Sequence, residues 1–165
     1  MHYFLLPMIP LTIAGAIFLK NRFAAYGFPV VLTSIKMFTT QVTPTYLFTA
    51  LALLAIAFLT RKLNSSANIS WVRVTGTAIL GVFVYALVSN FGVWFFGGCE
   101  PGGERLYALN LSGLLACYKA GLPYAGVHFL KAVPSTLVLV QVVAWMKQWN
   151  VAQNVQRLLT GKASS

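Results

Sequence analysis

The sequence predicts an all-α membrane protein, a compact bundle of five to six transmembrane helices. Apolar residues make up 58% of the 165-residue chain and charged residues only 8%. The mean hydropathy is +0.76. Several apolar runs approach the roughly 20 residues that a helix needs to cross a bilayer. A chain of this length holds about five or six such spans with short loops, which leaves no room for a second folded domain.

The positive charge of the chain is consistent with a membrane protein. The formal net charge is +10, which in a soluble protein would suggest nucleic acid as a partner. Here the lysines and arginines follow or precede apolar segments, where they set topology and contact lipid headgroups. We therefore expect membrane lipids as partners and no nucleic acid.

The first apolar segment runs from Tyr3 to Leu19 and is followed by Lys20 and Arg22. A signal peptide carries its positive charge before the apolar run, so we expect a retained helix. Small residues in this segment would let another helix approach closely, either within the bundle or from a partner subunit. The candidate partner contacts are Ala14, Gly15 and Ala16.

The next two expected spans are Ala24 to Phe38 and Tyr46 to Thr60. Pro44 suits the first turn of the second of these. Lys36 lies near the end of the first. Its side chain either snorkels to the headgroups or serves as a counter-ion to an anionic ligand.

A polar loop from Leu63 to Ser70 fixes the expected orientation. Arg61 and Lys62 precede it, and Arg73 follows it. The positive-inside rule places such a loop in the cytoplasm. Counting helices backward from this loop places the N-terminus outside.

The longest expected span is Trp71 to Phe96, with Trp71 and Trp94 as aromatic anchors at the two interfaces. The glycine-rich stretch that follows contains both acidic residues of the chain, Glu100 and Glu104. It lacks the Gly-Lys-Ser/Thr ending of a phosphate-binding loop. We expect an outward-facing lid or a simple turn.

The segment from Leu106 to Leu122 is short and interrupted by polar residues, so it either crosses the membrane or is re-entrant. The last expected span is Val133 to Trp145. The expected organisation is a bundle over residues 1–147 and a basic amphipathic tail over residues 148–165. The positive-inside rule favours the re-entrant alternative, which places the basic tail in the cytoplasm.

The catalytic inventory predicts no enzyme. The two carboxylates share one loop, and the two histidines are His2 and His128. No catalytic triad, metal cluster or redox pair can be assembled, so we expect no metal and no cofactor. His128 is either a polar residue at a helix end, or a ligand or proton-relay residue.

Two blocks carry a resemblance to a known family. They are Ser89-Asn90-Phe91-Gly92-Val93-Trp94, and Gly113-Leu114-Leu115 with Cys117-Tyr118 and Leu122-Pro123-Tyr124. Together with their spacing, they make the sequence from about Ala14 to Leu139 resemble a bacterial membrane-protein family of unknown function, related to the substrate-binding (S) components of energy-coupling-factor transporters.

This resemblance implies a six-helix bundle of the bacterial inner (cytoplasmic) membrane with both termini in the cytoplasm. Such a bundle captures a small molecule from outside and docks on a transmembrane coupling subunit powered by paired ATPases. The implied pocket lies under the outer loops. The candidate ligand-binding residues are Asn90, Trp94 and Tyr118, with Glu100 and Glu104 at the rim.

The chain also departs from the family pattern. Relatives tend to carry an aspartate in the second span, where this chain has Ile35 and Lys36. They carry an Asn and an Asp near the final span, where it has Val127 and Ala132. Intramembrane acidic residues are usually functional. The departures support an alternative hypothesis, a non-catalytic accessory subunit of a larger membrane complex that has lost the transport chemistry.

Overall fold

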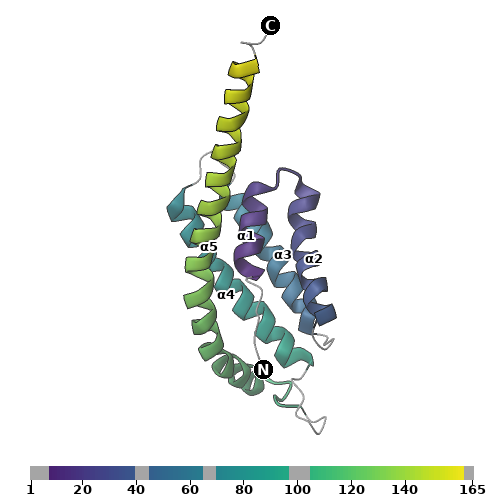
Figure 1. Cartoon of the computed structure of the whole chain (residues 1–165). Coiled ribbons are helices and arrows are strands. Elements are labelled where there is room, and N and C mark those ends of the chain that lie inside the picture. Colours follow the sequence, from purple (N-terminus) through teal and green to yellow (C-terminus); the bar gives the residue numbers. More distant parts are fainter. Residues whose placement is uncertain (1–7, 40–44, 65–69, 97–104, 162–165) are drawn as a thin grey trace.

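The computed structural model describes residues 8–39, 45–64, 70–96 and 105–161. These residues form helices and short connections, shown in Figure 1. The helices are α1 (Met8–Phe18), α2 (Arg22–Thr39), α3 (Thr45–Leu63), α4 (Trp71–Phe96) and α5 (Leu111–Gly161). The all-α architecture expected from the sequence is confirmed.

Within the described residues, three helical stretches are long and apolar enough to cross a membrane: α3, α4 and residues 111–149 of α5. The expected count of five to six spans is therefore not confirmed. The 11 residues of α1 give a helix of roughly 16 Å, about half the thickness of the hydrocarbon core. Helix α2 carries Arg22 and Lys36 among its 18 residues, which lowers its overall hydropathy.

Helix α5 differs most from the sequence expectation. The predicted segment up to Leu122, the predicted last span and the tail up to Gly161 form one continuous 51-residue helix that contains Pro123 and Pro134. A proline removes one backbone hydrogen bond and bends a helix, but helices in membranes continue through it when neighbouring groups satisfy the freed carbonyl. Figure 1 shows the bend: the first turns of α5 lie across one end of the bundle, and the rest runs along it.

The helices alternate in direction, so the basic segments gather at one end of the bundle. The α1–α2 turn, the end of α3, the start of α4 and the extension of α5 share that end (Figure 1). It is the end that the positive-inside rule places in the cytoplasm. Because the first turns of α5 lie across the opposite end, α5 passes along the bundle once.

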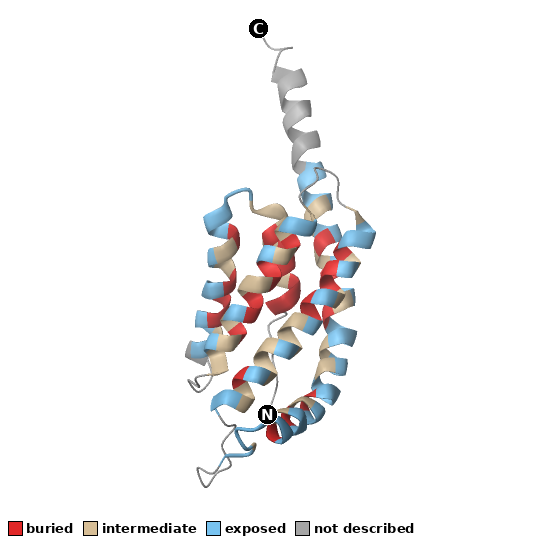
Figure 2. Cartoon of the chain, turned by 180° about the vertical axis from the view of Figure 1, so that it is seen from behind, coloured by how far each residue is buried: buried red, intermediate tan, exposed pale blue. Residues whose placement is uncertain are grey.

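The core lies where α1 meets the other four helices. Ile13, Leu53 and Ile56 are fully buried there, and Figure 2 shows most buried residues on stretches where the helices lie against one another. Ala14 and Ala16 are also buried. A Cβ atom on Gly15 would come within 2.8 Å of the Phe28 ring of α2. The small-residue patch of α1 is thus packed against the chain's own helices.

Two basic side chains hold the end of α1. Arg61 Nη1 donates hydrogen bonds to the carbonyl oxygens of Leu19 at 2.9 Å and Ala16 at 3.5 Å. Lys147 Nζ donates to the carbonyl oxygen of Phe18 at 3.4 Å. The last carbonyls of a helix lack partners within it, and a cation there is favourable to the helix dipole. Arg61 and Lys147 therefore fix α1 in addition to setting topology.

We expect Arg61→Met to lower the free energy of unfolding by about 1–2 kcal/mol, because it leaves the carbonyls at the end of α1 without their charged donor. Lys62→Met is the matched control, since Lys62 is the next residue and is exposed. Equilibrium unfolding of the detergent-purified variants measures both effects. Equal stabilities of the two variants would show that Arg61 does not hold α1.

Candidate functional site

The two sequence blocks meet in space at a contact that we call the α4–α5 joint, formed by residues 87–94 of α4 and 108–121 before and within α5. Three side-chain hydrogen bonds close it. Trp94 Nε1 donates to the Ala108 carbonyl at 2.9 Å, and the Tyr118 hydroxyl donates to the Leu87 carbonyl at 2.8 Å. Cys117 Sγ lies 3.4 Å from the Asn90 carbonyl. The resemblance blocks are therefore two sides of one structural contact.

Asn110 begins α5 as its N-terminal cap. Its side-chain oxygen accepts a hydrogen bond from the Gly113 amide at 2.8 Å, as an N-cap side chain does for an otherwise unpaired donor of the first turn. Gly113 packs directly against the backbone of Ala108, so any Cβ atom at this position would collide with it. The start of α5 is thereby held against the Ala108 carbonyl, which accepts the hydrogen bond from the Trp94 indole.

Glycine is also needed farther along the joint, where α4 and α5 approach closely. A Cβ atom on Gly121 would lie 2.5 Å from Oδ1 of Asn90. The Asn90 amide nitrogen donates to the Ala86 carbonyl at 2.8 Å, which holds the side chain along α4 and against α5. Asn90 is therefore a packing residue of the joint as well as a candidate ligand contact.

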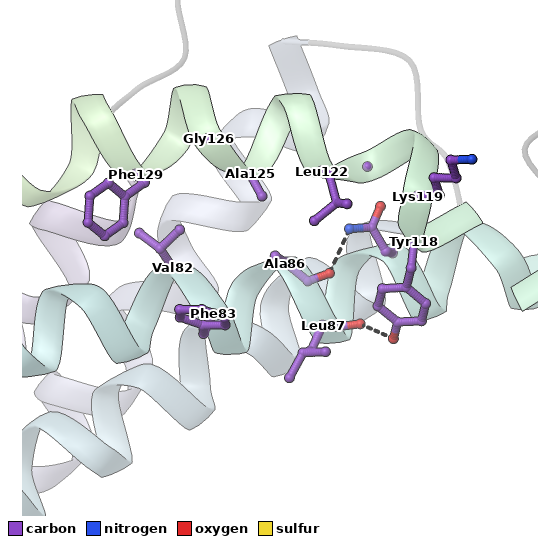
Figure 3. Close-up of a pocket in the computed structure, with 12 residues that line it drawn as sticks. Val82, Phe83, Ala86, Leu87, Tyr118, Lys119, Leu122, Ala125, Gly126 and Phe129 are labelled. Carbon is purple, nitrogen blue, oxygen red and sulfur yellow. Dashed lines mark hydrogen bonds between the residues drawn. The ribbon is translucent and has the colours of Figure 1, made fainter. Parts of the chain in front are cut away.

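A pocket of about 530 Å³ lies beside this contact (Figure 3). Its lining is almost entirely apolar, and Phe83, Leu87 and Leu122 on its walls are exposed. Exposed apolar side chains on a membrane-spanning helix are expected to face lipid, so we expect the pocket to open sideways toward the bilayer. We call it the outer pocket; it is lined by Val82, Phe83, Ala86, Leu87, Asn90, Tyr118, Lys119, Gly121, Leu122, Ala125, Gly126 and Phe129.

A second cavity of about 110 Å³, which we call the inner cavity, adjoins the outer pocket. Both are lined by Val82, Ala86 and Asn90 of α4 and by Gly121 and Ala125 of α5. Each set repeats every four residues and so forms one row along its helix. The other walls of the inner cavity lie on the opposite side of these rows and carry polar groups: Tyr85, Ser89, Tyr124 and His128.

The inner cavity is surrounded by further polar and cationic groups. The rings of Tyr85 and His128 lie 5.6 Å apart, and Thr49 of α3 makes a side-chain hydrogen bond with Tyr85. Lys36 of α2 and Lys131 of α5 lie close enough to His128 for their charges to act on it. The only carboxylates of the chain, Glu100 and Glu104, lie outside the described residues. The described charged groups around this cavity are therefore all cationic.

The structure separates the predicted site residues. Asn90 and Tyr118 line the outer pocket. Trp94 lines neither cavity, and its indole N–H is used within the joint. Glu100 and Glu104 lie outside the described part of the chain.

The sequence hypothesis did not find the inner cavity as a whole. It considered a functional role for Lys36 and for His128 separately, and it did not connect either residue to Tyr85 or Ser89. The available signal was the four-residue spacing of Val82, Ala86 and Asn90, together with Gly121 and Ala125. These spacings predict two helix faces able to pack closely.

This arrangement is suited to binding. The Asn90 amide and the Tyr118 hydroxyl donate hydrogen bonds to backbone carbonyls, but the amide oxygen and the hydroxyl oxygen can still accept one from a ligand. Within the described segments, no three His, Cys, Asp or Glu side chains are grouped so as to hold a metal ion.

Comparison with known proteins gives a family and no function. No curated protein matches the chain, and no solved structure does. One family model matches residues 2–156, which include the joint and both cavities. The chain therefore belongs to the family of unknown function DUF6580.

Proposed function

We propose that this protein captures a small, largely apolar molecule in the outer pocket, as an S-component-like subunit of an uptake transporter. The observation that carries the proposal is the position of this pocket. Asn90 from the first resemblance block and Tyr118 and Leu122 from the second line it. The blocks thus have a shared place where a ligand can bind.

The size and lining of the outer pocket support capture of such a molecule. A volume of about 530 Å³ falls within the usual range for small-molecule sites, which are mostly apolar with a few polar groups that orient the ligand. An apolar molecule concentrates in the bilayer and can reach the pocket from the side. The two cavities also lie toward the end of the bundle opposite the basic segments, which is the outer end in the expected topology.

The proposed partners are a transmembrane coupling subunit and its ATPases. The small-residue patch of α1 is a poor docking surface for such a subunit, because Ala14 and Ala16 are buried and Gly15 packs on Phe28. We expect the coupling subunit to contact an outward-facing helix surface of the bundle.

The test is gentle purification of the protein from its native membrane, followed by identification of what travels with it. A bound small molecule together with coupling and ATPase subunits would support transport. A stoichiometric complex of unrelated proteins with no small molecule would overturn it.

We expect Gly126→Leu to reduce the amount of co-purifying small molecule by at least about tenfold. Gly126 lines the outer pocket, and nothing lies within 4 Å of the position that a Cβ atom would take there. A leucine therefore fills the pocket without a clash at its first atom. A tenfold to 100-fold loss of affinity corresponds to about 1.4–2.8 kcal/mol, which lies within the cost of overpacking a well-packed site.

Gly76→Leu is the matched control, because Gly76 of α4 is equally open and lies away from both cavities. Mass spectrometry of organic extracts quantifies the bound molecule per mole of protein. Equal amounts in the two variants would exclude the outer pocket as the binding site.

A second candidate function is an accessory subunit that holds a larger membrane complex together. Its support is that the donors of Trp94 and Tyr118 are used across the α4–α5 joint, and that the Asn90 amide donates to the Ala86 carbonyl of its own helix. Under this proposal the blocks maintain a rigid bundle. Alanine at Asn90 or Trp94 would then disturb assembly of the complex, whereas under the capture proposal Asn90→Ala abolishes uptake and leaves assembly intact.

A further inference from the structure

The two cavities beside the α4–α5 joint differ in chemistry while sharing walls. The outer pocket is apolar and has a volume of about 530 Å³, and the inner cavity is polar and has a volume of about 110 Å³. Small residues, Ala86, Gly121 and Ala125, line both of them. Val82 and Asn90 line both cavities as well, and Asn90 lies against Gly121. Ala86 and Ala125 are therefore the part of the shared wall where one ligand can present an apolar part to the first cavity and a compact polar part to the second.

The inner cavity offers hydrogen-bond donors to that polar part. His128 and Tyr124 of α5 and Tyr85 and Ser89 of α4 line it. The Ser89 hydroxyl donates to the Tyr85 carbonyl at 2.6 Å, and the Tyr85 phenol is engaged with Thr49. The half-buried imidazole of His128 can donate into the cavity, and the phenol of Tyr124, on a side chain that is 72% exposed, can donate from its rim. These donors suit an acceptor with two oxygens.

The charge around the inner cavity favours an anion. Lys36 and Lys131 lie within electrostatic reach of His128, and the Lys36 amine lies 5.8 Å from the centre of the Tyr46 ring. Lys36 is half-buried and Lys131 is exposed. The partly buried charge of Lys36 is less screened than a charge in water, so it favours an opposite charge nearby. The small volume suits a carboxylate more than a bulkier headgroup.

We propose that the captured molecule is an amphipathic carboxylate, with its apolar body in the outer pocket and its carboxylate in the inner cavity beside His128. This inference rests on the proposed capture function and adds the chemical class of the substrate. It also gives Lys36 and His128, which are distant in sequence, one shared role.

The experiment compares decanoate with decan-1-ol, which has the same chain length and no charge. Binding of each radiolabelled compound is measured on the full-length protein in lipid nanodiscs, with empty nanodiscs subtracted. We expect the native protein to bind decanoate at least about tenfold more tightly, since hydrogen bonds to charged groups contribute about 1.5–3 kcal/mol.

Two variants remove the proposed recognition. His128→Phe keeps a ring against Tyr85 and removes both ring nitrogens, and Lys36→Met removes the charge and keeps most of the side-chain length. Each should weaken decanoate binding by roughly 10–100-fold and change decanol binding less than about twofold. Lys62→Met is the control, because Lys62 lines neither cavity, and it should keep the preference.

The outcomes separate this inference from the capture function. Equal binding of both compounds, blocked in both cases by Gly126→Leu, would overturn the carboxylate assignment and leave capture standing. Retention of the preference in His128→Phe and Lys36→Met, as in the Lys62→Met control, would also overturn it. Binding of neither compound would overturn the amphipathic carboxylate, and the molecule recovered from the native membrane would then decide the capture function independently.

Discussion

Gly92→Ala is expected to lower the free energy of unfolding by about 2–3 kcal/mol, because α3 and α4 leave no space for the added methyl group. A Cβ atom on Gly92 would lie 2.6 Å from both Cβ and Cγ of Phe48. Phe48 cannot easily move away. Its ring packs at 5.7–6.3 Å between centroids against Phe91, Phe95 and Phe96.

Gly76→Ala provides the matched control on the same helix. Nothing lies within 4 Å of a Cβ atom at Gly76, so alanine there should stabilise the helix by about 0.5–1 kcal/mol. Equilibrium unfolding in detergent compares the two variants with the unchanged protein. If Gly92→Ala were no less stable than Gly76→Ala, the close packing of α4 on Phe48 would be refuted.

Gly113→Ala is expected to have the largest effect of these substitutions, a loss of about 3 kcal/mol or more. The new methyl group would meet the backbone of Ala108, which cannot rotate aside as a side chain can. The same Ala108 carbonyl accepts hydrogen bonds from the Trp94 indole N–H at 2.9 Å and from the backbone N–H of Asn110 at 2.8 Å. Displacing it therefore loosens the start of α5 and the joint together.

The measurement for Gly113 combines unfolding with small-molecule content. We expect both to fall, because the joint positions Tyr118 and the other α5 residues of the outer pocket. Gly126→Ala is the control for stability, since Gly126 is in the same helix with open space around it. Unchanged stability in Gly113→Ala would mean that the contact with Ala108 does not hold the joint.

Much of the helical architecture could be predicted from the sequence. The expected span Trp71 to Phe96 has the same bounds as α4, because a long apolar run with aromatic ends is a strong local signal. The expected second and third spans lie within α2 and α3. Asn90 and Tyr118 were named as candidates, and both line the outer pocket.

Other features depended on contacts between segments distant in the sequence. Pro123 and the polar residues before it predict a break, but α5 continues through them. Arg61 of α3 donates a hydrogen bond to the Leu19 carbonyl at the end of α1, more than 40 positions away in the sequence. Trp94 reads as an interfacial anchor, yet its N–H is used by the Ala108 carbonyl.

The sequence by itself predicted a helical membrane protein, an orientation from the positive-inside rule, and a family resemblance carried by two blocks around Asn90 and Tyr118. Hydropathy and charge are sums over local residues, so they need no knowledge of partners. Only the tertiary structure decided that the blocks form a joint beside two cavities of different chemistry. The cavities form where α4 packs on α5 at Gly121 and Ala125. Neither segment alone specifies how closely the two helices approach.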